Sequence, residues 1–230
     1  MARRAALLLA LLLPCTHVQA APLDGRAQSD VVALHTQFMA HLGGQDPDPA
    51  RAEMLQRVAE RLLSAVNIAP CSCTFEVFLV RSKDAVAFSM VGGYIYISRA
   101  MLDLTATEAE VAAVLGHEIA HVLLQHALLR DLVARAEGNP QEKVLALEDL
   151  GRALELEADA YSIELLWGAG YDPMAQARLL ERMGAVMEKS ALQTTAFWPQ
   201  YPSALRAAMK QRRAVAAAIA ESVARGAPGG

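Results

Sequence analysis

One string in the sequence has the residue types and spacing to bind a metal ion and hydrolyse a bond with its help. Residues 117–121 read His-Glu-Ile-Ala-His. Two histidines four residues apart on an α-helix lie about 40° apart around its axis, so both imidazoles can reach a single Zn²⁺. Glu118 would stand beside the open coordination position, where a carboxylate can act as a general base. The string predicts the centre of a metal hydrolase with one zinc ion per chain.

A helix is well marked around this string. Thr107 followed by Glu110 forms a capping box at its start. Apolar residues then recur at helical spacing, namely Val111, Val114, Leu115, Ile119, Val122 and Leu123. We expect one helix from Thr107 to a break at residues 138–140. The alternative, two structural histidines on a buried helix, is disfavoured because the complete string and the cap occur together.

Two histidines leave a zinc site one protein ligand short. His126 is the nearest candidate, but nine residues beyond His117 place it on the opposite face of the same expected helix, so we exclude it. A later helix offers Glu155 and Asp159, which share a face, whereas Glu157 is rotated by about 200° from Glu155. We expect Glu155 to bind zinc and Asp159 to accept a hydrogen bond from a ligating imidazole.

The remaining patterns predict a mostly helical α+β domain with a small sheet before the metal-binding helix. Three short strands are expected, and the periodicity elsewhere is helical. The strands are predicted at residues 74–80, 85–90 and 94–98. Helices are predicted at residues 29–42, after Pro49, from 140 to about 167, up to about 189, and after Pro202.

Residues 1–20 have the parts of a secretory signal peptide: a basic start, a short apolar run and small residues before an expected cleavage after Ala20. The apolar run is too short to span a bilayer. Cys15 raises the alternative of a lipoprotein anchor, but Pro14 stands where a small residue is expected. We therefore expect cleavage and secretion across the inner membrane into the periplasm, with no transmembrane span in the mature chain.

The length of 230 residues fits one substantial domain. We expect it over residues 21–225, followed by a disordered tail at residues 226–230. Cleavage after Ala20 would remove two arginines and no acid, which changes the formal net charge from −4 to −6. Because no basic stripe remains, we exclude nucleic acid as a partner.

Export would leave Cys71 and Cys73 as the only cysteines. In an oxidising compartment they could close a small strained disulfide, remain reduced or bind metal. Two thiols cannot complete a cysteine-rich zinc site. We favour a local disulfide over a redox centre.

A larger set of motifs resembles a known family. The H-E-x-x-H string is followed on a later helix by Glu-x-x-x-Asp and then by Gly-Tyr-Asp-Pro at residues 170–173, and residues 87–98 are similar to the family's strands around a Gly-Gly turn. The resemblance covers roughly residues 74–206. It is to the gluzincin zinc metallopeptidases of the CAAX prenyl endopeptidase and HtpX type (metallopeptidase family 48), including soluble secreted or periplasmic members. It implies a zincin-like domain with zinc ligands His117, His121 and Glu155, catalytic Glu118 and supporting Asp159.

Three positions depart from the family pattern. Val86 and Val91 stand where the family usually has Asn and Pro, and Tyr201 replaces the histidine of a His-Pro pair thought to assist at the transition state. A phenol can still donate a hydrogen bond to an oxyanion, so we assign Tyr201 that catalytic role. The alternative is that Tyr201 packs beside Phe197 and Trp198.

The resemblance implies a zinc-dependent endopeptidase acting on polypeptides. If residues 94–98 form an edge strand above the cleft, substrate can pair with it through its backbone, which suits unfolded or misassembled proteins in envelope quality control. Envelope protein complexes are possible partners. Two alternatives are open: a chaperone-like relative that does not cut, and a latent enzyme whose zinc is capped by His126 or by residues 193–201.

Overall fold

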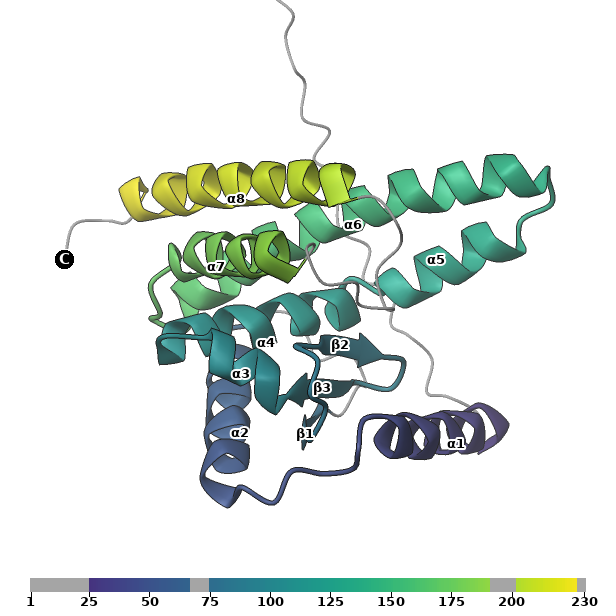
Figure 1. The fold of residues 1–230 in the computed structure, drawn as a ribbon, viewed down its shortest axis with the longest axis horizontal. Coiled ribbons are helices and arrows are strands. Elements are labelled where there is room, and N and C mark those ends of the chain that lie inside the picture. Colours follow the sequence, from purple (N-terminus) through teal and green to yellow (C-terminus); the bar gives the residue numbers. More distant parts are fainter. Residues whose placement is uncertain (1–24, 67–74, 191–201, 227–230) are drawn as a thin grey trace, which may run out of the picture.

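The computed structural model describes residues 25–66, 75–190 and 202–226. Within these ranges, helices surround a small three-stranded sheet (Figure 1), which confirms the predicted mostly helical α+β fold. Several predictions fall outside the described residues. They concern the signal peptide with Cys15, the cysteines Cys71 and Cys73, the segment 193–201 with Tyr201, and all of the expected tail except Gly226.

The sheet contains β1 (Glu76–Val80), β2 (Ala87–Met90) and β3 (Tyr94–Ser98), close to the predicted strands. The strand order is β1-β3-β2, with β1 parallel and β2 antiparallel to β3. The expectation that residues 94–98 form an edge strand is therefore wrong. Ile95, Tyr96 and Ile97 are all fully buried, as in a central strand covered on both faces. The edge beside the helix that carries residues 117–121 belongs to β2.

Two helices precede the sheet: α1 (Gly25–His41) and α2 (Pro49–Ser64). The Asp48 side chain accepts a hydrogen bond from the backbone N–H of Arg51, and Pro49 occupies the first turn, so the sequence specifies where α2 starts. The inner face of α2 packs against the core that α4 and the sheet share, through Leu55, Val58, Ala59 and Leu62.

The helix that carries residues 117–121 is α4 (Glu108–Leu123). Half of the predicted capping box is present: Thr107 Oγ1 accepts from Glu110 N at 3.2 Å, whereas the Glu110 carboxylate accepts at 2.7 Å from Ala106 N, one residue before the cap. A short helix not predicted from the sequence, α3 (Arg99–Leu104), joins β3 to α4. Figure 1 shows α4 between the sheet and the later helices, in the middle of the core.

The expected single helix after Thr107 is broken. The chain leaves α4 after Leu123 and begins α5 (His126–Arg135) at an angle of 50°. Gln125, between them, has the left-handed φ of 56°, although no glycine or proline marks the position. The break overturns the placement of His126 on the far side of α4.

Three further helices complete the fold: α6 (Pro140–Gly168), α7 (Ala175–Ser190) and α8 (Pro202–Arg225). The C-terminal half of α6 packs against α4, α7 and α8, whereas its first half forms with α5 a hairpin that extends beyond the rest of the domain (Figure 1). None of the described helices, taken alone, is both long and apolar enough to cross a membrane; α4 and α5 together meet these criteria but are bent at their junction.

Helices α4 and α6 approach closely at Gly116, next to the first histidine. A Cβ atom there would lie 2.7 Å from Ser162 Oγ, which is buried and lies 3.2 Å from both Ala113 O and Gln176 Oε1. We predict that Gly116→Ala lowers the free energy of unfolding by about 1–3 kcal/mol, because the Ser162 hydroxyl must leave its partners. Urea denaturation measures the change.

A second substitution checks the cause of that loss. The same Cβ atom would lie 3.6 Å from Ser162 Cα and Cβ, which is ordinary contact distance. Adding Ser162→Ala to Gly116→Ala should therefore be less destabilising than the two separate changes summed. Simple additivity would assign the effect to something other than this contact.

Candidate metal centre

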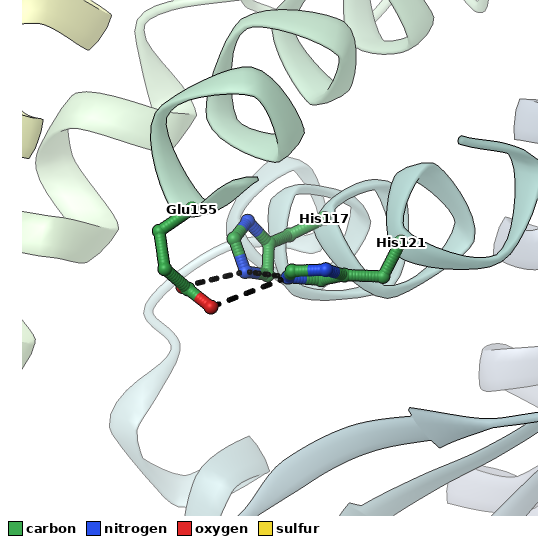
Figure 2. Close-up of side chains that lie close together, drawn as sticks. All are labelled: His117, His121 and Glu155. Carbon is green, nitrogen blue, oxygen red and sulfur yellow. Dashed lines mark hydrogen bonds and ion pairs between the residues drawn. The ribbon is translucent and has the colours of Figure 1, made fainter. Parts of the chain in front are cut away.

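Three side chains from two helices converge on one point (Figure 2). His117 and His121 extend from α4, and Glu155 extends toward them from α6. His117 Nε2 and His121 Nε2 are 3.0 Å apart, and the Glu155 oxygens lie 3.3 Å from the first and 3.5 Å from the second. Within the described ranges, this is the one group with the composition and spacing to hold a metal ion.

The spacing fits zinc. Ligand atoms about 2.0–2.1 Å from a tetrahedral zinc ion lie about 3.3 Å from one another, close to the three separations observed. Two imidazoles and one carboxylate are also a common protein donor set for catalytic zinc, which keeps the fourth position for water. The residues therefore fit the metal that the sequence motif predicts.

Asp159 lies behind His117, one turn along α6 from Glu155. It is fully buried, and its Oδ1 is 3.0 Å from His117 Nδ1, the ring nitrogen that faces away from the metal position. The buried amide of Gln176 donates to the same oxygen at 2.7 Å. Asp159 can therefore hold the His117 ring in one orientation, in the way that outer carboxylates support metal-ligating histidines.

The sequence reasoning missed Arg212 on α8. Its guanidinium donates to both Asp159 oxygens at 2.7 and 2.8 Å, and its third nitrogen is 3.0 Å from Glu155 Oε2. A signal for it was available: Arg212 lies three residues after Met209 and four before Ala216, both buried, so helical spacing places it on the inner face.

The two carboxylates in this cluster favour a positive charge at the point where the three side chains meet. Burial alone would raise carboxyl pKa values, but His117 and Arg212 lower the pKa of Glu155 to about 2, and Arg212 and His117 hold that of Asp159 below its usual range. Burial lowers the pKa of His121 to about 3, so His121 is neutral. Burial also opposes charge on His117, but Asp159 and Glu155 outweigh it and raise its pKa to about 9. Arg212 balances one of the two carboxylates and the protonated His117 balances the other, so a metal ion that displaces this proton would supply the same positive charge.

Glu118 is buried beside this cluster. Burial, with the negative charge of Glu155, raises the pKa of the Glu118 carboxyl, while His117 and a hydrogen bond with Ser89 of β2 act in the opposite direction. A carboxylate with a raised pKa is a better proton acceptor, as a general base requires. The edge strand β2, on which Ser89 lies, packs against α4, the helix that carries Glu118.

The two remaining candidates from the sequence, Glu157 and His126, lie away from the metal position. Glu157 is largely exposed, and its carboxylate is 3.5 Å from His126 Nε2. His126 itself is buried, and its Nδ1 is 2.8 Å from His121 Nδ1, on the side of that ring opposite Nε2. His126 therefore cannot be the zinc cap considered from the sequence, and residues 193–201, the other cap considered, lie outside the described residues.

We predict that Arg212→Met lowers the free energy of unfolding by about 2–3 kcal/mol at pH 7 with chelator present. Removing one partner of a fully buried pair costs about 3–5 kcal/mol, and the Arg212 side chain is 17% exposed. Asp159 and Glu155 have lowered pKa values, so their contributions are complete above an ordinary carboxyl pKa of about 4 and are lost as pH falls. The difference between wild type and variant should therefore shrink below about pH 4.

Arg213 provides the matched control for this prediction. It is the next residue on α8 and pairs at 3.1 Å with Glu181, with both side chains more than half exposed. Exposed pairs contribute about 0–1 kcal/mol, so Arg213→Met should be close to wild type. Equal losses for the two variants would contradict the structural role given to Arg212.

A helix with H-E-x-x-H, joined by a glutamate from a second helix and backed by a carboxylate, is the arrangement that the resemblance to gluzincin metallopeptidases predicts. Residues 49–141 match the family model described as Peptidase family M48, a range that contains both histidines but ends before Glu155. Over that range the chain is similar to peptidase family M48, whose members are zinc metallopeptidases.

Curated relatives are similar over most of the chain. The beta-barrel assembly-enhancing protease of Escherichia coli strain K12 is 25% identical over 177 residues, covering 64% of this chain and 36% of that protein. The metalloprotease LoiP of the same organism is 29% identical over 165 residues, covering 61% of this chain and 63% of LoiP. The mitochondrial metalloendopeptidase OMA1 of Schizosaccharomyces pombe is 25% identical over 217 residues, covering 82% of this chain and 64% of OMA1. The chain thus spans little more than a third of the first of these relatives.

Proposed function

We propose that this protein is a zinc-dependent endopeptidase that hydrolyses peptide bonds in unfolded or misassembled proteins of the cell envelope. The observation that carries the proposal is the convergence of His117, His121 and Glu155 with Glu118 buried beside them. The similarity to peptidase family M48 and to relatives named as proteases supports it. One zinc ion per chain is proposed, with these three residues as ligands and Glu118 as the general base.

Within this proposal, a bound zinc ion supplies a water of pKa about 7 and polarises the substrate carbonyl. Glu118 accepts the proton of the attacking water and delivers it to the leaving amine. Asp159 holds His117, while Arg212 fixes the Asp159 and Glu155 carboxylates in place. Tyr201, outside the described residues, remains the proposed hydrogen-bond donor to the developing oxyanion.

The substrate class follows from the edge of the sheet. β2 is an edge strand in the described part of the chain, and it packs against α4, which carries Glu118. An extended polypeptide paired with β2 would present its backbone close to that carboxylate, with little dependence on side chains. We therefore transfer the proposed substrate-binding role from residues 94–98 to β2.

The envelope location rests on two separate supports. Residues 1–20 have the pattern of a secretory signal peptide, and one relative is named for the assembly of beta-barrels. We propose secretion to the periplasm, cleavage after Ala20 rather than a lipid anchor at Cys15, and polypeptide substrates, with envelope protein complexes as partners.

Metal analysis combined with a cleavage assay tests the function. The purified chain should contain one zinc per molecule and cleave casein or another unfolded protein, and a chelator should stop cleavage until zinc is restored. Zinc binding without cleavage of any unfolded substrate would favour the chaperone-like alternative and contradict the proposal. Cleavage that appears only after a segment is removed would favour the latent enzyme.

A further inference from the structure

His126 is a buried imidazole that lies directly behind the second histidine of the motif. It is 1% exposed, and its Nδ1 is 2.8 Å from His121 Nδ1. The two rings meet edge to face, with centroids 4.8 Å apart. His121 therefore contacts His126 through Nδ1, while its other ring nitrogen, Nε2, faces Glu155.

The position of His126 depends on the break between α4 and α5. A continuous helix would carry residue 126 to the far side of α4, whereas the left-handed Gln125 starts a new helix with His126 as its first residue. A left-handed residue other than glycine costs about 1 kcal/mol or more and persists where the surrounding structure requires it. One effect of this strained turn is to bring His126 back against His121.

Zinc binding by His121 would determine which ring nitrogens of the two histidines carry a proton. A neutral imidazole that binds metal through Nε2 carries its proton on Nδ1. His121 then donates from Nδ1, and His126 must accept at its own Nδ1 with a lone pair. The proton of a neutral His126 is then on Nε2, the nitrogen that lies 3.5 Å from the Glu157 carboxylate.

We propose that His126 is a positioning residue that accepts a hydrogen bond from His121 and thereby fixes the ring orientation and tautomer in which His121 binds zinc. This inference rests on the proposed zinc site. The two ligating histidines are then supported differently, His117 by the Asp159 carboxylate and His121 by a neutral imidazole. Outer partners of this kind typically contribute a factor of about 10–100 to metal affinity.

Two substitutions separate hydrogen bonding from packing. His126→Phe retains a ring of similar size but has no acceptor, whereas His126→Asn is smaller but can place its Oδ1 near the position of the imidazole Nδ1. Competition with a chromophoric chelator should show zinc affinity reduced about 10- to 100-fold in His126→Phe and less than about threefold in His126→Asn. A packing role predicts the reverse order.

His35 provides the control histidine. Its Nδ1 lies 2.7 Å from the Tyr96 hydroxyl, in an aromatic cluster between α1 and the sheet. His35→Phe removes a similar contact away from the metal-binding residues and should leave zinc affinity as in wild type. An equal loss in His35→Phe and His126→Phe would show a general effect of destabilisation and overturn the assignment.

The tautomers give a second readout that needs no substitution. Long-range ¹H–¹⁵N correlations on the zinc-loaded wild type should show a proton on His121 Nδ1 and on His126 Nε2. A proton on His126 Nδ1 would overturn the inference even if His126→Phe did not fold. A wild type that binds no zinc would instead contradict the proposed function, so the two failures are distinguishable.

Discussion

Glu155→Ala is expected to abolish stoichiometric zinc binding, and with it peptidase activity, whereas Glu157→Ala leaves both close to wild type. The Glu155 carboxylate lies 3.3 Å from His117 Nε2 and 3.5 Å from His121 Nε2. Removing it leaves two imidazoles, too few to complete the three-ligand set of a catalytic zinc site. Glu157 leaves α6 in a different direction and is largely exposed.

The comparison uses two glutamates two residues apart on one helix, so loss of charge and of side-chain volume is matched. Zinc content after dialysis, measured by elemental analysis, is the readout, with circular dichroism to check that both variants fold. Equal zinc content in the two variants would remove Glu155 from the ligand set. Loss in Glu157→Ala alone would show that a different face of α6 carries the ligand.

Glu118→Gln should retain zinc and fold while lowering kcat by about 10²–10⁴-fold, the usual contribution of a general base. The amide has nearly the volume of the carboxylate but cannot accept the proton of water. Glu118 has no place among the three converging ligand atoms, so the metal-binding set stays complete. The variant therefore separates chemistry from metal binding.

Glu108→Gln is the matched control, because Glu108 lies exposed on the first turn of the same helix and contacts only the Tyr171 hydroxyl among the described hydrogen bonds. It should have wild-type turnover. The rates of the two variants are compared by single-turnover cleavage of a fluorogenic unfolded substrate, with zinc content measured on the same sample. Unchanged turnover in Glu118→Gln would exclude it as the base.

The part of the site that lies on single helices could be predicted from the sequence. The relative positions of His117 and His121, and of Glu155, Glu157 and Asp159, depend only on the rotation per residue of an α-helix. The strands before α4 and the capped start of α4 could also be predicted, because the alternation of apolar residues and the capping signal each involve only a few neighbouring residues.

The features that could not be predicted depend on tertiary contacts. Helical spacing places Arg212, unlike Arg213, on the buried face of α8, but its contact with Asp159 spans 53 residues of sequence and no local pattern predicts it. The break at Gln125 replaces an uninterrupted helical pattern with a strained turn, against local propensity. The order of the strands is also a global property, which is why the edge was assigned to the wrong one.

The hairpin of α5 and the first half of α6 lies along the chain between the two histidines of α4 and Glu155, although the three side chains converge in space. Its tip, residues 136–139, is exposed, while α4 and the C-terminal half of α6 pack against each other independently of that tip. Doubling the length of a flexible loop costs only about 0.6 kcal/mol in closure entropy. We therefore expect insertions at this tip to leave the geometry of His117, His121 and Glu155 intact, so that a new binding specificity can be attached there without rebuilding the site.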